Sequence, residues 1–425
     1  MWVLFDMERQ GVYIDREHME TAIPMLEEAI TTYKADLHEA FDDDEQKINF
    51  GSTIQLADAL IKSGVKLSAK TDKGAWKLDV NVLNALATKH EICKTIVDYR
   101  QAMKMLSTYG LAILTKSAAD GHLHCTYNQN VSTGRMSSAG PNLQNIPNPK
   151  SELSALIRGA FTAPSDEYVM VFIDYSQVEV RVTAHYSQDP ILLDVYNRTH
   201  EDIHTRTLCE MFGLDYAEAH AANKDAHHPK HHDVAMQRKI AKMINFLIIY
   251  GGGAKNLAEK ISTPKKPYTT LECQRFIDKY FRRFRGVKQW IEDTKLYVRD
   301  AKEVQNYFGR YRRFHEELEN YERKLRRKST AWKVLRAERQ AVNFLIQGTC
   351  ADLFKIAMVK ANRILQGTKS RLVMTIHDEL VFYMHRSELS LIKEIKESME
   401  DWNFRVPLVA DVSFTATSWD RKQEL

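Results

Sequence analysis

Acidic side chains follow two parts of the chain that are apolar enough to form buried strands. Asp174 comes directly after the apolar run 168–173, and Asp378 and Glu379 lie between two shorter apolar runs. A single acid at the end of a buried strand is usually only structural. Burying the adjacent acids Asp378 and Glu379 is costly, however, unless a cation neutralises them. The pattern therefore indicates a cation site wherever these strand ends meet.

A second pattern is a ladder of side chains at every fourth residue, formed by Arg238, Lys242, Phe246 and Tyr250 and followed by three glycines. Steps of four keep residues on one helix face, with about 6 Å between neighbours. Two cations followed by two rings match the phosphates and the nucleoside of a nucleoside triphosphate. The glycines end the helix and let a large partner approach. An amphipathic core helix explains the same spacing, so the ladder alone favours binding only weakly.

Two further segments carry polar side chains suited to hydrogen bonding with a nucleic acid. Residues 133–147 form an expected loop with many amide, hydroxyl and arginine donors. The other segment is an expected helix with polar residues at every fourth position, namely Arg339, Asn343 and Gln347. A structural loop or helix face could carry the same residues, so neither segment decides the partner.

The net charge of the 425-residue chain is modest, but the charge is unevenly distributed. The whole chain has 60 Lys and Arg against 56 Asp and Glu, which gives +4. Residues 281–340 alone have 18 basic and 9 acidic residues, so the remainder is acidic. Such a basic sector either grips a polyanion or forms a solvated, salt-bridged helical face.

The five cysteines are scattered and form no Cys-x-x-Cys pair, which argues against a disulfide framework or a zinc knuckle. We therefore expect a reducing, cytoplasmic location. No uninterrupted apolar run approaches the length of about 18 residues that spans a bilayer, and the first residues lack the features of a secretory signal. No membrane partner is expected.

The expected elements belong to the α+β class. Helical spacing covers 22–40 and 80–114, and a long helical region is expected over about 191–361. Within it, Thr269 and Glu272 form a capping box that opens a helix reaching Phe284. Strands are expected at 168–173 and, as a hairpin, at 371–376 and 380–384.

Taken in order, these motifs resemble those of the DNA polymerase I family (family A). Residues 174–181 (DYSQVEVR) resemble motif A, residues 238–251 resemble motif B, and His377-Asp378-Glu379 resembles motif C. Residues 133–147, 201–204, 308–310 and 347–349 also match family segments. The resemblance runs from about residue 3 to the C-terminus.

The resemblance implies a right-hand polymerase with an antiparallel palm sheet and helical fingers and thumb. The expected parts are an entry segment of the palm side at 1–30, a thumb at 31–120, palm at 121–204, fingers at 205–340 and further palm at 341–425. The implied activity is template-directed DNA synthesis, in which dNTPs are added to a primer 3′-hydroxyl.

The resemblance also implies the residues of the reaction centre. Asp174 and Asp378 would hold two Mg²⁺ ions, for which Mn²⁺ could substitute, with the Tyr175 carbonyl as an auxiliary ligand. Glu379 would be a supporting carboxylate nearby. Lys242 could donate a proton to the departing pyrophosphate.

By the same resemblance, a group of side chains would bind the incoming nucleotide. Arg238, Lys242 and His204 would contact the triphosphate, and Tyr250 would lie near the templating base. Phe246 and Gln177 would complete the nucleotide site. Glu179 would be a steric gate that crowds the 2′ position of a ribonucleotide.

The remaining implied contacts are with primer-template DNA. They comprise four residues of the 133–147 loop, three of the later helix and one beside Asp378: Arg135, Asn142, Gln144, Asn145, Arg339, Asn343, Gln347 and His377. Minor-groove acceptors are common to all base pairs, so such contacts would check pairing geometry without reading sequence.

Two alternatives to a DNA polymerase stay open. A single-subunit RNA polymerase shares the two aspartates and a related motif B, although Glu179 argues for deoxynucleotides. A catalytically silent primer-template binding protein would keep the fold without the chemistry.

Some features depart from the family pattern. Leu247 replaces a usual glycine and Cys350 a usual alanine, and five histidines lie between His220 and His232. Metal binding by these histidines is less favoured than a solvated loop.

Nuclease activity is not expected. The polymerase resemblance begins near the first residue, and Asp6 and Glu8 are interpreted as part of the family's entry segment rather than as a proofreading pair. A phage-like or stand-alone monomer is expected, in a bacterial or phage-infected cytoplasm. An exonuclease or a processivity factor that acts in trans stays open as a partner.

Overall fold

The computed structural model describes residues 2–71, 73–117, 119–149, 151–263 and 266–424, and its central element is a five-stranded sheet. The strand order is β11-β10-β5-β9-β8, and neighbouring strands are antiparallel. The strands are β5 (Tyr168–Tyr175), β8 (Arg371–Ile376), β9 (Glu379–His385), β10 (Ala410–Thr415) and β11 (Gln423–Glu424). The expected antiparallel sheet and its β8–β9 hairpin are confirmed.

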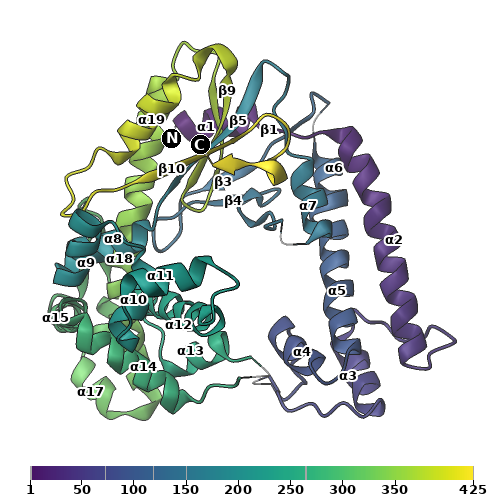
Figure 1. The fold of residues 1–425 in the computed structure, drawn as a ribbon, viewed down its shortest axis with the longest axis horizontal. Coiled ribbons are helices and arrows are strands. Elements are labelled where there is room, and N and C mark those ends of the chain that lie inside the picture. The colour runs from purple at the N-terminus through teal and green to yellow at the C-terminus, as the bar shows by residue number, and fades with distance from the viewer. Residues whose placement is uncertain (1, 72, 118, 150, 264–265, 425) are drawn as a thin grey trace.

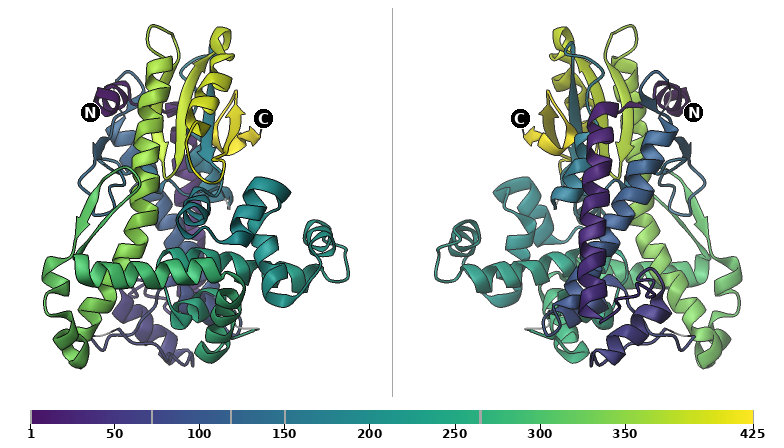
Figure 2. Two further views of the ribbon diagram at one scale, coloured as in Figure 1. Left: turned by 90° about the vertical axis from the view of Figure 1, so that its left-hand side faces the viewer. Right: turned by 90° about the vertical axis from the view of Figure 1, so that its right-hand side faces the viewer.

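Helices from both ends of the chain pack against this sheet (Figure 1, Figure 2). α18 (Lys328–Ile364) is 37 residues long and contacts β8, α1 (Trp2–Gln10) and α19 (Leu391–Glu400). Among the described helices, α18 alone is long and apolar enough to cross a membrane, and 78% of its apolar window is buried inside the protein. Such burial is what the core helix of a globular protein shows.

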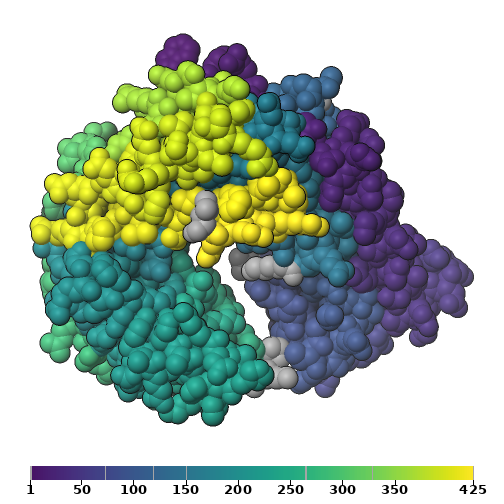
Figure 3. Space-filling model, turned by 45° about the horizontal axis from the view of Figure 1, so that its top comes forward, coloured from purple at the N-terminus to yellow at the C-terminus, as the bar shows by residue number. Residues whose placement is uncertain are grey.

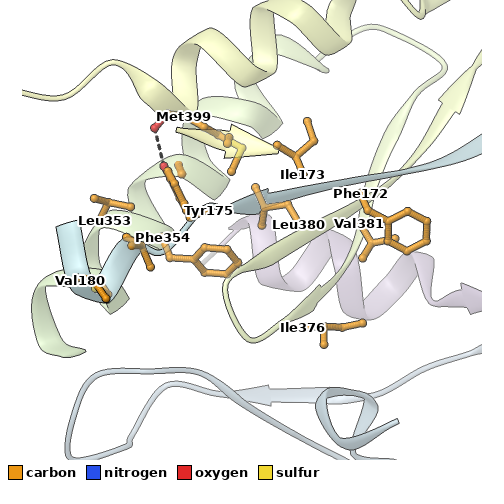
Figure 4. Packing of buried hydrophobic residues seen from close by; sticks show 14 of the residues in the cluster. Phe172, Ile173, Tyr175, Val180, Leu353, Phe354, Ile376, Leu380, Val381 and Met399 are labelled. Carbon is orange, nitrogen blue, oxygen red and sulfur yellow. Dashed lines mark hydrogen bonds between the residues drawn. The ribbon is translucent and has the colours of Figure 1, made fainter. Parts of the chain in front are cut away.

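The end of β5 is held in place by side chains of α8 (Val178–Ser187), α18 and α19. Figure 4 shows the Tyr175 ring beside Leu353 and Phe354 of α18 and near Val180 of α8. The Tyr175 hydroxyl donates a hydrogen bond of 2.6 Å to the carbonyl oxygen of Met399 on α19. The strand end that carries Asp174 is therefore fixed by packing on one side of the sheet.

A second group of elements is mainly helical and lies below the sheet in Figure 1. Its members are α9 (Pro190–Asp194), α10 (Ile203–Phe212), α11 (Tyr216–Lys224), α12 (His231–Ile249), α13 (Ala254–Ile261), α14 (Thr270–Arg283), α15 (Arg285–Ala301), α16 (His315–Leu318), α17 (Tyr321–Arg326) and the hairpin of β6 (Glu303–Gln305) and β7 (Tyr311–Arg313). The hairpin interrupts a region that the sequence indicated to be helical throughout. The capping box of Thr269 and Glu272 is confirmed at the start of α14.

The third group is formed by α2 (Arg16–Ala40) and α5 (Ile92–Lys104), which pack together along their length, with α3 (Thr53–Lys62) and α4 (Val80–Ala87) at one end (Figure 1). The helical spacing expected over 80–114 is confirmed for most of this range, but a break separates α4 from α5. α4 ends at Ala87 because the chain turns there, with the amides of Lys89 and His90 both donating to the carbonyl of Leu86. This turn lets α4 fold back on α5 and close a separate apolar core between residues 37 and 99.

Short elements complete the fold. They are β1 (Val12–Tyr13), β2 (His122–Leu123), β3 (Thr126–Asn128), β4 (Ser137–Ala139), a π-helical segment (Met105–Leu111), α6 (Ala112–Lys116) and α7 (Glu152–Gly159). The three groups of elements surround an open space (Figure 3). The division into thumb, palm and fingers at the expected boundaries stays a prediction. All five cysteines lie in the described residues and are buried and free of disulfides, as expected.

Candidate active site

The two acids singled out in the sequence meet on adjacent strands. β5 lies between β9 and β10, and Asp174 is paired in register with Glu379 on one side and with Asp411 on the other. Directly opposed residues of antiparallel strands point to the same face of a sheet. The side chains of Glu379, Asp174 and Asp411 therefore form a row, called the carboxylate row below. Asp378 lies next to this row, because its main-chain carbonyl oxygen accepts a 3.4 Å hydrogen bond from the Tyr175 amide.

Beside this row lies a cavity of about 570 Å³, called the site cavity below. Many of the residues expected at the reaction centre and in the nucleotide site line it, namely Asp174, Tyr175, Gln177, Glu179, His204, Phe246, Asp378 and Glu379. His377, which was expected to contact DNA, lines it as well. Arg158, Trp419 and Lys422 also line it, although nothing in their sequence context pointed to them. The cavity thus brings together residues from motif A, motif B and motif C.

The carboxyl groups of the site are held in an environment that disfavours their negative charge. The recess restricts water around Asp174, and this effect, followed by the charges of Glu379 and Asp378, raises the pKa of Asp174 to about 7, with Lys422 opposing the shift. Burial also raises the pKa of Asp378 above its ordinary value, while Arg135 and His377 oppose the rise. The positive charges near these carboxyls, such as Lys422 and Arg135, therefore do not fully balance the negative charge of the ionised acids.

Glu179 accepts three hydrogen bonds at a single carboxylate oxygen, Oε1. The donors are Arg135 Nη2 at 2.6 Å, the Tyr250 hydroxyl at 3.2 Å and Gln347 Nε2 at 3.3 Å. The Glu179 side chain is 6% exposed. Burial raises its pKa, and the Arg135 charge and the hydrogen bonds oppose that rise. The expected gate is therefore tied to the loop before β4, to the end of α12 and to α18.

The ladder of motif B lies on α12, but its members have different surroundings. Arg238 donates to Asp202 Oδ2 from Nη2 at 2.8 Å and from Nε at 3.0 Å. Lys242 is exposed, and Phe246 is half-buried, with its ring centre 5.8 Å from that of His204. A phosphate that binds Arg238 must therefore compete with Asp202.

His204 is buried, and Asn245 Nδ2 lies 3.1 Å from its Nδ1. Burial, with help from the charges of Arg238 and Lys242, lowers the pKa of His204 to about 4, against an opposing effect of Asp202. The ring is neutral at pH 7, so any contact with a triphosphate would be made as an uncharged hydrogen-bonding group.

Comparison with known proteins accounts for this arrangement. The model of DNA polymerase family A matches residues 16–421. The chain belongs to this family.

Relatives and a solved structure extend the match over nearly the whole chain. The DNA polymerase I of Caldicellulosiruptor bescii is 33% identical over 416 residues, which cover 96% of this chain and 45% of that protein. The thermostable DNA polymerase I of Thermus aquaticus is 35% identical over 417 residues, 96% of this chain and 46% of that protein. The chain thus spans about half the length of these curated relatives.

The polymerase domain of Pol1 from M. smegmatis, solved in complex with DNA primer-template and dNTP, superposes with a TM-score of 0.84 at 28% identity. The match covers 98% of this chain and 69% of that one. The α+β right-hand polymerase fold expected from the sequence is therefore confirmed.

The family's expected DNA-binding residues lie outside the carboxylate row, and several also have structural contacts here. Asn142 Oδ1 accepts from the Gln144 amide at 3.1 Å and caps the short turn Leu143–Asn145. Asn343 Nδ2 donates to the Ile249 carbonyl at 3.3 Å. Arg339, Asn145 and His377 are exposed, whereas Gln347 is buried against Glu179. Their contacts with DNA stay predictions.

The departures from the family pattern are absorbed by packing. Leu247 is 3% exposed and lies so close to Gly252 that a Cβ there would come within 2.3 Å of its Cδ1. Leu247 therefore requires a glycine at position 252. Cys350 is buried in the main core.

Neither the histidine-rich stretch nor the Asp6-Glu8 pair forms a metal cluster in the structure. His231 Nδ1 lies 2.9 Å from the Ala222 carbonyl, and His228 Nδ1 accepts from the Lys230 amide. No group of three or more His, Cys, Asp or Glu side chains among the described residues is arranged to hold a metal, and this includes the carboxylate row. A cation there would therefore need further oxygen ligands, such as a main-chain carbonyl or a substrate phosphate. Glu8 accepts a hydrogen bond of 2.5 Å from the Tyr127 amide, which favours its interpretation as part of the entry segment.

The raised pKa of Asp174 leads to a prediction about stability. Between pH 3.8, the ordinary pKa of an aspartate, and about pH 7, Asp174 binds a proton more tightly in the folded protein than in the unfolded chain. Stability therefore falls as the pH rises through this window, and the loss is fully present above it. We expect Asp174→Asn to raise the Tm of the metal-free protein by about one to two degrees near pH 8.

The difference between the two proteins should become small near about pH 4 and vanish below about pH 3, where Asp174 is protonated in both states. Thermal unfolding in the presence of EDTA measures both values. An equal or lower Tm of Asp174→Asn at the higher pH would contradict the prediction.

Proposed function

We propose that this chain is a DNA-directed DNA polymerase that adds dNTPs to the 3′-hydroxyl of a primer on a DNA template. The observation that carries the proposal is the meeting of Asp174 and Asp378 at one end of a cavity whose wall includes Phe246 of α12. This arrangement supports a cation site near a helix that also carries the cations Arg238 and Lys242. The relatives named above support the same activity.

The donor set fits Mg²⁺. Asp174, Asp378 and the Tyr175 carbonyl would hold it, because hard divalent cations prefer oxygen ligands and Mg²⁺ sites commonly use one or two carboxylates together with substrate phosphates. The raised pKa values of both carboxyls support this assignment, since a divalent cation would relieve the uncompensated negative charge. When bound, two such ions supply activation of the primer hydroxyl and stabilisation of the leaving pyrophosphate.

The side chains of α12 would position the triphosphate. Lys242 is exposed and free to contact a phosphate, and it could then protonate the departing pyrophosphate. Arg238 would exchange its Asp202 partner for a phosphate oxygen, which it can bind through two parallel N–H groups. Phe246 and Tyr250 would contact the nucleoside, and Gln177, whose Oε1 accepts from the Tyr196 hydroxyl at 3.0 Å, would border the same site.

Primer extension tests the proposal. A labelled primer on a longer DNA template is incubated with the protein and either dNTPs or rNTPs, with Mg²⁺, with Mn²⁺ or with EDTA. We expect extension with dNTPs and a divalent cation and none with EDTA. Preferential use of rNTPs would favour the RNA polymerase alternative, and DNA binding without any extension would favour the silent binding protein.

A further inference from the structure

Lys422 lines the site cavity, and its ammonium group is paired with a carboxylate of the row. Lys422 Nζ is 2.6 Å from Glu379 Oε1 and 4.9 Å from the centre of the Phe172 ring. Glu379 lies next to Asp174 in the sheet register. A positive charge of the protein itself therefore stands at the edge of the proposed cation site.

The position of Lys422 is fixed by the fold on both sides. Three residues earlier, Trp419 is 1% exposed, with its ring stacked on Phe172 and in edge contact with Phe161. On the other side, β11 pairs with β10 through Gln423 and Phe414. Lys422 is thus held between a buried anchor and a strand, rather than on a free tail.

The charges around Lys422 are mostly negative. The carboxylate row places three acids side by side, and Asp378 adds a fourth beside them. The fixed positive charge of Lys422 weakens the negative potential that attracts a divalent cation. Lys422 also binds an oxygen of Glu379 that could otherwise turn toward the divalent cation.

We propose that Lys422 is a tethered counter-ion of the carboxylate row, which weakens the binding of divalent cations to the site before nucleotide arrives. The inference rests on the proposed function, because it concerns the same cation site. Its consequence is ordered loading: the site gains its full affinity for a cation only when a triphosphate adds negative charge on the side of α12. Lys422 acts through Glu379 and is a positioning residue rather than a catalytic one.

Binding of Mn²⁺ to the DNA-free and nucleotide-free protein tests the inference without any measurement of synthesis. Free Mn²⁺ is followed by electron paramagnetic resonance during titration of the native protein and of Lys422→Gln. Removing one positive charge a few ångströms from the site should tighten Mn²⁺ binding by about tenfold. Added dNTP should then tighten Mn²⁺ binding less in Lys422→Gln than in the native protein.

Three further variants make the result specific. Lys422→Arg keeps the charge and should bind Mn²⁺ like the native protein. Arg421→Gln removes the same charge from the neighbouring side chain, which is exposed and pairs only loosely with Asp420 at 3.9 Å, so its affinity should change by less than about twofold. Asp378→Asn should weaken binding, because it removes a proposed ligand.

The outcomes separate the inference from the proposed function. Equal or weaker Mn²⁺ binding by Lys422→Gln, with binding still lost in Asp378→Asn, would overturn the counter-ion and leave the cation site intact. Undiminished binding by Asp378→Asn would overturn the cation site itself. A Lys422→Gln protein that lacks the native circular dichroism spectrum would show that Lys422 acts in folding, and this result would also overturn the inference.

Discussion

Asp378→Asn is expected to lower the rate of primer extension by about three orders of magnitude while leaving the affinity for primer-template DNA nearly unchanged. Asp378 follows the β8 strand in the turn of the hairpin, and its neighbour in space is the end of β5. An amide of nearly the same size keeps the packing of this turn but removes the charge that a divalent cation needs. The stabilisation lost is several kcal/mol, which corresponds to the expected fall in rate.

Two measurements on the same preparation decide this prediction. Single-turnover extension with Mg²⁺ gives the rate, and fluorescence anisotropy of labelled primer-template gives the affinity. Asp401→Asn is the matched control, because it makes the same change at a carboxyl that is not part of the row and whose side chain is 86% exposed. Extension by Asp378→Asn at a rate close to that of the control would exclude the proposed role.

The second large effect is expected for the sugar selectivity of Glu179→Ala. The native side chain cannot move aside easily, because it is buried and its Oε1 is held by donors from three segments. Truncation to Ala opens the space next to the expected sugar position. We expect the preference for dNTPs over rNTPs, measured as the ratio of kcat/KM values for one added nucleotide, to fall by about a hundredfold.

Glu179→Gln separates the size of this side chain from its charge. The amide fills the same space and can still accept a hydrogen bond at its oxygen, so we expect the selectivity to stay within about threefold of the native value. The rate with dNTPs should fall in both variants, because Arg135 loses its charged partner. A Glu179→Ala protein with native selectivity would show that another group excludes the ribose.

The residues that could be predicted from the sequence are those whose signal is local. The apolar run before Asp174 and the hairpin around Asp378 were both expected, because strand patterns depend on neighbouring residues. Asp411 and Lys422 escaped notice because their importance depends on which residues face them across β5 and β10. Strand register is set by the whole sheet, and the residues close to Asp411 and Lys422 in sequence do not indicate it.

Roles of polar side chains were harder to predict from the sequence, because the same side chain can bind a partner or stabilise the fold. Asn142 was expected to contact DNA, and in the structure its side chain caps a turn, which is a common use of asparagine in loops. Similarly, the break at Thr88 in the region 80–114 has no proline or glycine to announce it. It arises because folding α4 back onto α5 buries apolar side chains.

The three donors on Glu179 Oε1 have one more consequence. A carboxylate oxygen offers about two lone-pair directions, so three donors on one oxygen compete and cannot all reach full strength. The bond from Arg135 is short and charge-assisted, whereas those from Tyr250 and Gln347 are longer. Tyr250 can therefore leave at little cost, since its departure strengthens the bonds that remain. The end of α12 is therefore fastened to α8 by a contact that breaks easily, and under the proposed function this leaves the end of the helix free to move when a nucleotide binds.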